Sequence, residues 1–237
     1  MRASLLHERI NRGGVLIGVA PPFVSADVVE FFGLLGFDWI LLDGEHGPVG
    51  VESCHSLIRA ADAVGLATVV RIPANEPWLV LTYAESGADA ILVPHIADAA
   101  AAEHLAQAIR YAPSGRRGSM SGSRAANYGL TQTASDYFVA SDHHALPIAM
   151  IEDMGYPGGF DNPTVRAEVH DAATRLSQAR KTVATVVTDT ASAAAAIDAG
   201  VRLITLSAGG IITRSAREAI ATIRDTAARA LENSAAD

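Results

Sequence analysis

The chain has 237 residues, of which 49% are hydrophobic and 19% charged, a composition typical of a soluble globular protein. Its formal net charge of -8 argues against sequence-independent nucleic-acid binding, which requires a basic surface. Charged residues interrupt every apolar segment before it reaches the length of a membrane span, and charge comes too early at the N-terminus for a secretory signal. Cys54 is the one cysteine, so no internal disulfide can form and we expect a cytoplasmic protein.

Short apolar runs alternate with longer helical patterns, which predicts βα units around a parallel sheet. No change of composition divides the chain, so we predict a single domain over residues 1–237. The predicted strands are Val15–Ala20, Trp39–Leu42, Thr68–Ile72, Ala90–Val93, Pro147–Ile151, Thr182–Val187 and Leu203–Leu206. The predicted helices are Ser25–Leu35, Val51–Val64, Pro77–Ser86, Ala97–Tyr111, Pro163–Arg180, Ala191–Ala199 and Ser215–Asn233.

Seven strands are one fewer than an α/β protein of the (β/α)8 TIM-type barrel class contains. The stretch from Asp153 to Thr182 holds a Gly/Pro-rich turn and one helix, with no eighth strand. We therefore predict a barrel that lacks one βα unit near residues 153–163, with an open seam that Met154–Asn162 or a partner subunit covers. The segment Ala112–Leu146 has little regular patterning, and we expect a functional or mobile loop there.

Polar residues gather at the ends of two predicted strands. The apolar run Trp39–Leu42 is followed by Asp43, Glu45 and His46, and then by a Gly-Pro break. Such a run suits a strand buried on both faces, and polar groups at its carboxyl end suit the active-site face of a barrel. Arg71 follows Val69-Val70 on the next predicted strand, where burial of a guanidinium is costly. We therefore predict a site here; a surface turn cluster and a structural ion pair are the alternatives.

One residue count argues against a whole class of mechanism. The chain has a single lysine, Lys181, and 17 arginines. A Schiff-base enzyme needs a lysine amine near its substrate. Because Lys181 directly precedes a predicted strand, it belongs to the face of a barrel that serves stability. We therefore do not expect covalent imine chemistry.

Several further residues have an ordinary structural interpretation. His95 follows a predicted strand and either faces the barrel mouth or packs under a loop. His143 and His144 are adjacent, so their side chains point apart, and no third ligand has useful spacing; we expect a surface loop rather than a metal site. Cys54 stands beside His55 on a predicted amphipathic helix, which favours a core thiol over a nucleophile.

Taken together, several ordered motifs resemble the HpcH/HpaI aldolase family, metal-dependent class II lyases that act at pyruvate-like carbons. The resemblance implies a (β/α)8 barrel and a carbon–carbon lyase (aldolase) that acts on 2-keto acids and aldehydes through a pyruvate or oxaloacetate enolate. The motifs are Phe37–Pro48, Val70–Pro73, Gly87–Pro94 and Arg110–Gly118, within a match that runs from about Gly13 to Ile151 and resumes near Gly155.

The resemblance also implies roles for the predicted site residues. Arg71 matches the arginine that holds the developing enolate oxygen. His46, oriented by Asp43, matches the base that moves the proton, and Glu45 would lie near the water shell of the metal. We expect Arg71, Glu45 and Arg116 to contact substrate; for Arg116, contact with a subunit neighbour is the alternative.

A divalent cation (Mg²⁺, Mn²⁺ or Co²⁺) is implied by the same resemblance, but its site departs from the family pattern. Glu152 matches the first metal carboxylate, whereas the Gly-Pro-Ala-Asp-Leu-Ser-like segment that carries the second is absent. We expect Asp153 to serve as the second ligand, with Asp161 as the alternative, because a single carboxylate binds a hard cation weakly. Met150 also stands where the family often has Gln.

These departures leave two other hypotheses open. One is a recruited synthase or decarboxylase that forms or breaks carbon–carbon bonds with little or no dependence on metal. The other is a catalytically inactive barrel that serves as a binding or scaffold protein, although the retained polar cluster argues against it. The resemblance further implies a homo-oligomer, in which the C-terminal helix, at about residues 215–233, packs on or is exchanged with a partner subunit.

Overall fold

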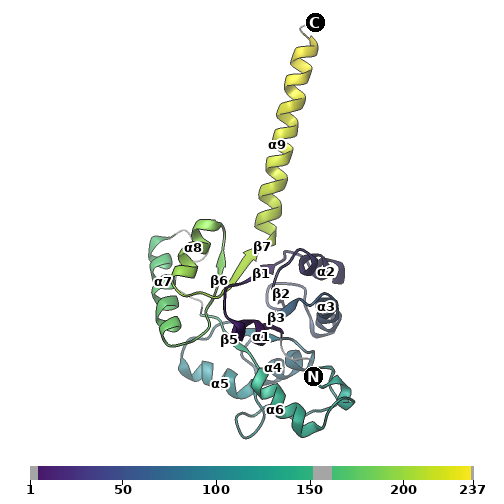
Figure 1. Ribbon diagram of the computed structural model, residues 1–237, viewed down its shortest axis with the longest axis vertical. Helices are drawn as coiled ribbons and strands as arrows, with labels where there is room; N and C mark the ends of the chain where they lie inside the picture. The colour runs from purple at the N-terminus through teal and green to yellow at the C-terminus, as the bar shows by residue number, and fades with distance from the viewer. Residues whose placement is uncertain (1–4, 152–161, 236–237) are drawn as a thin grey trace.

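The computed structural model describes residues 5–151 and 162–235. In these ranges seven parallel strands form one curled sheet, an open half-barrel with the order β5-β4-β3-β2-β1-β7-β6 (Figure 1). All seven predicted strands are confirmed, and the described residues contain no eighth. The strands are β1 (Leu16–Ala20), β2 (Trp39–Asp43), β3 (Ala67–Arg71), β4 (Ala90–Val93), β5 (Pro147–Ala149), β6 (Ala184–Val187) and β7 (Leu203–Ser207).

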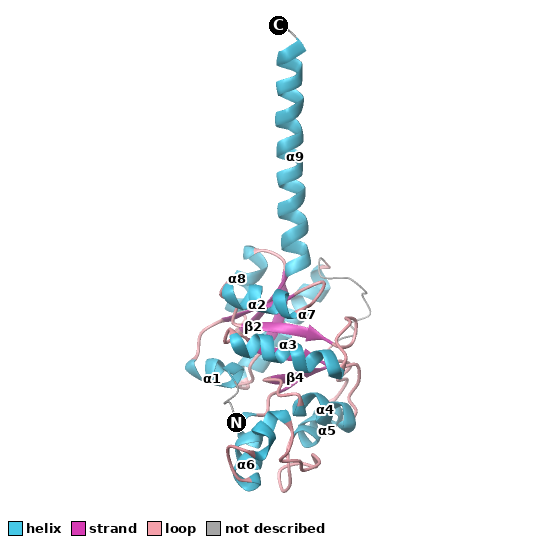
Figure 2. Cartoon of the chain, turned by 90° about the vertical axis from the view of Figure 1, so that its right-hand side faces the viewer, coloured by secondary structure: helices cyan, strands magenta, loops and turns pink. Residues whose placement is uncertain are grey.

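Helices join successive strands and cover the outside of the curled sheet (Figure 2). All seven predicted helices are confirmed to within a few residues, except that the last begins seven residues earlier than expected. They are α2 (Ala26–Leu34), α3 (Val51–Ala63), α4 (Pro77–Glu85), α5 (Ala99–Ile109), α7 (Pro163–Gln178), α8 (Thr190–Asp198) and α9 (Ala208–Ala235).

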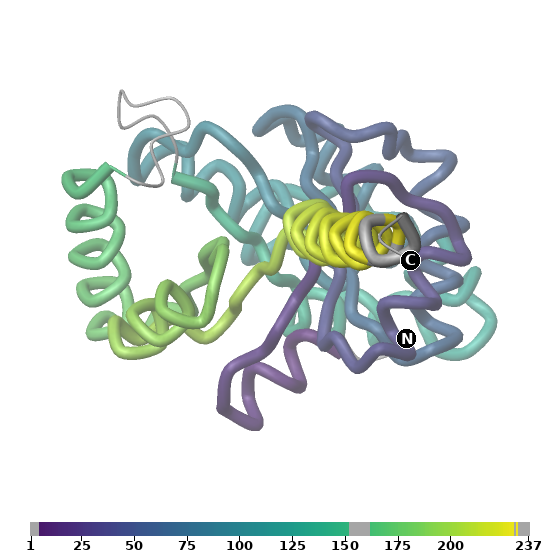
Figure 3. The backbone as a smooth tube through the Cα atoms, turned by 90° about the horizontal axis from the view of Figure 1, so that it is seen from above, coloured from purple at the N-terminus to yellow at the C-terminus, as the bar shows by residue number. Residues whose placement is uncertain are grey.

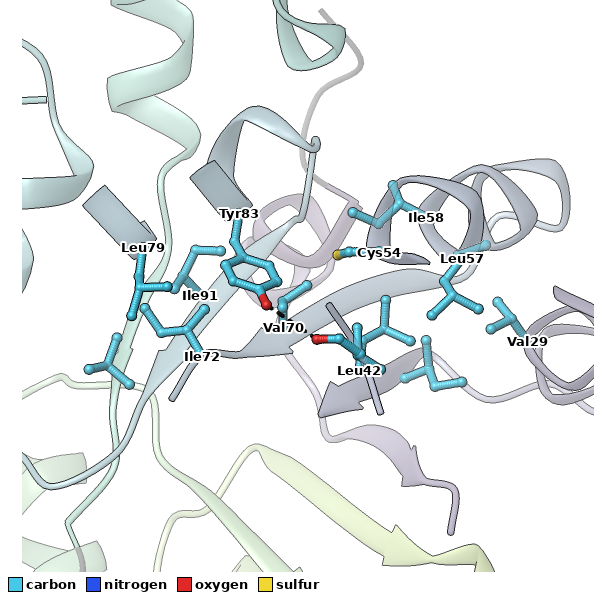
Figure 4. Close-up of a cluster of buried hydrophobic side chains, with 14 of the residues drawn as sticks. Val29, Leu42, Cys54, Leu57, Ile58, Val70, Ile72, Leu79, Tyr83 and Ile91 are labelled. Atoms are coloured by element: carbon cyan, nitrogen blue, oxygen red, sulfur yellow. Dashed lines mark hydrogen bonds between the residues drawn. The ribbon is translucent and has the colours of Figure 1, made fainter. Parts of the chain in front are cut away.

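Alternation along β2 divides its apolar residues between two clusters. In β2, Ile40 and Leu42 are 0% exposed and belong to one buried cluster with residues of α2 and α3, part of which is drawn in Figure 4. Trp39 and Leu41 belong to a second cluster on the concave side of the sheet. Since successive side chains of a strand point to opposite faces, Asp43 shares the concave side with Trp39 and Leu41.

A short helix that the sequence did not predict, α1 (Leu5–Arg12), lies at the amino ends of the strands. Leu6 is fully buried in the concave cluster. Arg9 donates from Nη2 to the carbonyl of Gly65 at 3.0 Å, and the first N–H of the helix donates to Asp89 at 2.8 Å. Both partners precede strands, so α1 is fastened to the edge of the sheet opposite the strand carboxyl ends.

The expectation of an irregular Ala112–Leu146 segment is wrong in part. The segment contains a 3₁₀ helix, η1 (Arg124–Gly129), and an α-helix, α6 (Ala134–His144). Thr133 caps α6 by accepting a first-turn N–H at 3.2 Å. Among its buried residues only Tyr137 is large and apolar, so the helix has no apolar periodicity for a sequence pattern to reveal.

Strands β5 and β6 are the two edges of the sheet, so the predicted seam is present in the described part of the chain. Beside the seam, Val186 of β6 points to the concave side and is 48% exposed. Of the segment Met154–Asn162 that we expect to cover the seam, residues 154–161 lie outside the described ranges, so this expectation stays a prediction.

Helix α9 leaves the carboxyl end of β7 and extends away from the rest of the chain (Figures 1 and 2). Figure 3 looks almost along its axis. Residues 210–229 of this helix are all exposed, including Ile220 at 48% and Ile223 at 67%. No described helix is long and apolar enough to cross a membrane.

Candidate active site

The register of β2 and β3 places Asp43 directly opposite Arg71 at the carboxyl edge of the sheet. Arg71 donates from Nε to Asp43 Oδ1 at 2.9 Å and from Nη2 to Oδ2 at 2.7 Å. This bidentate pairing fixes the plane of the guanidinium, as two parallel charge-assisted hydrogen bonds do. The ends of β2 and β3 thus bring Asp43 and Arg71 together, as the sequence predicted. The two side chains also form the ion pair that we named as the structural alternative.

Glu45 adds a second carboxylate to the same guanidinium. Its Oε2 lies 3.2 Å from Arg71 Nη1, and the two side chains are 9% and 14% exposed. Charges shielded from water interact more strongly than exposed charges do. Arg71 is therefore a largely buried cation that lies between two carboxylates.

The carboxylate of Asp43 is kept in its charged form. Burial raises its pKa, but the hydrogen bond from Arg71 and the backbone N–H groups of His46 and Glu45 outweigh that effect, so the pKa is lowered. The two backbone donors lie 3.2 and 3.1 Å from Oδ1. Asp43 therefore also shapes the turn that follows β2.

Two imidazoles flank Glu45 at the exposed rim. His46 Nε2 lies 3.7 Å from Glu45 Oε2, and His95 Nε2 lies 3.5 Å from Glu45 Oε1; their side chains are 71% and 69% exposed. We expected Asp43 to orient the His46 ring, and this expectation is wrong. Asp43 accepts a hydrogen bond from the backbone N–H of His46, and the carboxylate near the ring belongs to Glu45. His95, which the sequence left open between the barrel mouth and a covered position, faces the site.

His95 reaches Glu45 from an uncommon backbone conformation. Its φ is +58°, in the left-handed region that side chains other than glycine seldom adopt. Such a conformation persists only where surrounding contacts enforce it. The signal available in the sequence was its place just after β4, which matches the place of Asp43 at the end of β2.

The loop between β2 and α3 is packed tightly against the sheet. Gly44 donates its N–H to the carbonyl of Arg71 at 2.8 Å, and a Cβ on Gly44 would lie 2.8 Å from that oxygen. Glycine is therefore required at this approach. Tyr83 reaches from α4 and donates to the carbonyl of Val49 at 3.2 Å (Figure 4), and burial raises the pKa of its phenol. These contacts hold Glu45 and His46 over Arg71.

The predicted metal ligands Glu152 and Asp153, and the alternative Asp161, lie outside the described residues. The backbone leading to them is described: Met150 accepts from the N–H of Ile96 at 3.2 Å and donates to the carbonyl of Val93 at 2.9 Å. The chain therefore reaches residue 152 from the carboxyl end of β5, the same edge of the sheet that carries Asp43 and Arg71.

Arg116 does not join this cluster. It is exposed, and its N–H donates to the carbonyl of Gln107 in α5 at 2.7 Å. The adjacent Arg117 lines a cavity of about 330 Å³ with Asp89 and Leu146, which precede β4 and β5. Arg116 thus lies toward the opposite edge of the sheet, so our expectation that it contacts substrate in its own chain is not supported, and contact with a neighbouring subunit remains the prediction.

Two residues set aside on sequence grounds are placed as expected. Lys181 is exposed and precedes β6, at the amino edge of the sheet. Cys54 is 0% exposed in the core between the sheet and α3 (Figure 4), and burial raises its pKa to about 12. Neither the amine nor the thiol of these residues reaches the cluster around Arg71.

Comparison with known proteins identifies the family to which the chain belongs. The model of the HpcH/HpaI aldolase/citrate lyase family matches residues 21–153. The chain belongs to this family. Hydroxypyruvate/pyruvate aldolase of Agrobacterium fabrum is 31% identical over 201 residues, which cover 73% of this chain and 75% of that protein. The Roseobacter denitrificans protein of the same name is 28% identical, with 84% and 89% of the two chains covered.

A solved structure agrees with this assignment. The crystal structure of a family member from Burkholderia cenocepacia J2315 matches with a TM-score of 0.85 and 28% identity, and it covers 93% of this chain and 99% of that one. The predicted family and the predicted enzyme class, a carbon–carbon lyase, are thereby confirmed.

Proposed function

We propose that this lyase cleaves and forms the bond between a 2-keto acid of the pyruvate type and an aldehyde, through an enolate that Arg71 stabilises. The observation that carries the proposal is the guanidinium of Arg71, fixed by Asp43 on one edge and approached by Glu45 on another. Two relatives named hydroxypyruvate/pyruvate aldolase support this class of keto acid.

Arg71 acts by electrostatic stabilisation. As the carbon–carbon bond breaks, negative charge collects on the former carbonyl oxygen of the keto acid, and a positioned cation lowers the energy of that state. Because Asp43 orients the guanidinium beforehand, little reorganisation is needed when the charge develops. Removal of one such donor group typically costs about 10²–10³-fold in rate.

The two histidines and Glu45 handle protons. In the cleavage direction the hydroxyl of the substrate must lose a proton and the enolate carbon must gain one. His46 is the proposed base for the hydroxyl, because its exposed Nε2 lies at the rim with Glu45 nearby to stabilise the imidazolium. His95 is placed on the other oxygen of Glu45 and is the proposed second proton carrier.

A divalent cation fits the chemistry of the remaining acids. Among the described residues of the site, Asp43 is engaged by Arg71 through both oxygens and Glu45 lies against the same cation. Glu152 and Asp153 are hard oxygen donors of the kind that Mg²⁺ and Mn²⁺ prefer, so they are the residues proposed to hold the ion. A cation bound there supplies Lewis-acid polarisation of the keto-acid carbonyl.

We also propose that the half-barrel corresponds to a (β/α)8 barrel without the βα unit between β5 and β6. Solved relatives cover almost all of the described chain, which supports the common architecture. A single domain over residues 1–237 is part of this proposal.

The proposal is tested by enolate formation itself. In D₂O the methyl protons of pyruvate should exchange in the presence of enzyme and Mn²⁺ or Mg²⁺, as followed by ¹H NMR, and Arg71→Ala should slow exchange by about 10²-fold or more. Addition to glycolaldehyde then measures bond formation. No exchange and no turnover in wild type, with ligand binding unchanged in Arg71→Ala, would favour the inactive scaffold instead.

A chelator distinguishes the remaining alternative. EDTA should abolish exchange, and added Mn²⁺ should restore it. Full activity in EDTA would instead favour the synthase or decarboxylase that does not depend on metal, while leaving the role of Arg71 intact.

A further inference from the structure

Three histidines meet at the amino edge of the sheet, opposite the active site. His7 lies on α1, and His143 and His144 end α6 just before β5. The ring of His7 is 5.5 Å from that of His143 and 5.1 Å from that of His144, and the latter two rings are 5.2 Å apart. One nitrogen of each ring lies within 4.8 Å of the others. Helix α1 therefore supplies the third histidine, which spacing along the chain did not reveal.

The spacing is close to that of three imidazoles around one cation. A tetrahedral ion at about 2.0–2.1 Å from each nitrogen places the nitrogens about 3.4 Å apart and the ring centres about 5 Å apart. The ring centres already have this spacing, so binding requires small rotations of the rings. His143 is exposed and can rotate without disturbing the core.

The surroundings of His144 include a buried nitrogen, Nδ1, that makes no hydrogen bond with any of the described residues. Burial, followed by the neighbouring histidines, lowers the pKa of His7 and His144. The carboxylate of Glu8 is near enough to act on both rings.

A further polar contact orients one of the rings. The amide nitrogen of Asn11 lies 3.2 Å from Nδ1 of His7. Amide oxygen and nitrogen can exchange places, so this side chain can accept from Nδ1–H when the other nitrogen binds an ion. Ligating histidines are commonly fixed through their second nitrogen in this way.

We propose that His7, His143 and His144 form a structural site for a borderline-soft divalent cation such as Zn²⁺. Three imidazoles suit Zn²⁺, Ni²⁺ or Cu²⁺ and discriminate against Mg²⁺, the oxygen-seeking type of ion proposed for the active site. A bound ion would clip α1 to the junction of α6 and β5. Because β5 is an edge of the open sheet, the clip would stabilise the strand that leads into the active site.

The test uses the untagged chain of 237 residues, stripped with chelator and then held in excess Mg²⁺. Co²⁺ should add one equivalent per chain, with the visible absorption of a tetrahedral site, and Zn²⁺ should displace it. His143→Ala should weaken Co²⁺ binding at least tenfold and remove the rise in Tm that Zn²⁺ gives to wild type. His104→Ala and His170→Ala, at exposed histidines elsewhere, should bind as wild type does.

The outcomes separate this site from the active site. Pyruvate exchange should be unchanged in His143→Ala, with circular dichroism used to check that this variant folds. The inference is overturned if wild type takes up no Co²⁺ in excess Mg²⁺. It is equally overturned if uptake survives in both His143→Ala and His7→Gln, and loss of that uptake in Glu152→Gln would then assign the ion to the active site.

Discussion

Among single residues, Asp43 must carry a negative charge to hold the guanidinium of Arg71 in a fixed orientation. Asp43→Asn keeps the size of the side chain but removes the charge and one acceptor, so the guanidinium loses its fixed orientation. We expect pyruvate exchange to fall by about 10²-fold, because the group that stabilises the enolate is no longer held in place. The matched control is Asp27→Asn, at an exposed first-turn position of α2, which should leave exchange unchanged.

The same pair makes a prediction about pH. Since the pKa of Asp43 is lowered in the folded protein, its ionic contacts stabilise the fold above the unfolded pKa of about 3.9. That stabilisation is lost as pH falls through the lower folded value. The difference in free energy of unfolding between wild type and Asp43→Asn, from urea titrations, should therefore be constant from pH 7 to 5 and shrink below about pH 4. A difference that grows on acidification would contradict the assignment.

The burial of Cys54 can also be tested, because it is the one thiol in the chain. Because burial raises its pKa to about 12, the thiol stays protonated and inaccessible at pH 8. We expect a disulfide reagent such as DTNB to react only on the timescale of unfolding, and one thiol per chain to appear at once in denaturant. Complete labelling of the folded protein within minutes would show that Cys54 is not a core residue.

At the scale of elements, β1 and β2 meet at a contact that admits no side chain. Gly18 stands opposite Trp39 in the register, and a Cβ on Gly18 would lie 2.0 Å from the indole ring. Trp39 is 4% exposed in the concave cluster, so the ring has little room to move. We expect Gly18→Ala to cost about 1–3 kcal/mol of unfolding free energy in urea titrations.

The control for this contact is Gly118→Ala. The nearest atom to a Cβ there is 3.6 Å away, an ordinary contact, and the residue is exposed. If both variants lose the same unfolding free energy, the loss comes from replacing glycine by alanine in general and not from a clash with the indole ring of Trp39.

The elements also show how far sequence reasoning reaches. Strands β2 and β3 were predictable because buried parallel strands require unbroken apolar runs, and their register follows once they are neighbours. Helix α6 buries too few apolar residues to show a period, and α1 is short and charged. Both helices gain their stability from contacts distant in sequence, which local patterns do not encode.

The site divides in the same way. That Asp43 and Arg71 would meet followed from their places at the ends of neighbouring strands. That Glu45, rather than Asp43, would face the His46 ring depends on how Gly44 folds the loop onto β3. The trio of His7, His143 and His144 depends on where α1 lies. These arrangements are set by tertiary packing, so spacing along the chain could not reveal them.

In the whole molecule, α9 is a long helix that extends away from the other described elements. A helix of 28 residues is about 42 Å long, and helices in proteins gain most of their stability from the packing of an apolar face. Ile212, Ile220, Ile223 and Leu231 are exposed and share one stripe, since their positions fall within about 100° of each other at 3.6 residues per turn. Such a stripe requires a partner, and the proposed partner is a second copy of the chain.

The partner should be lost when a charge enters the stripe. We expect wild type to elute as an oligomer in size exclusion with light scattering, and Ile223→Glu to shift toward the monomer, because a buried carboxylate without a counter-charge opposes docking. The matched control is Ala221→Glu, which places the same charge on the opposite side of α9, exposed like the stripe. A wild type that is monomeric at micromolar concentration, or an Ile223→Glu chain with unchanged mass, would exclude α9 as the contact between copies.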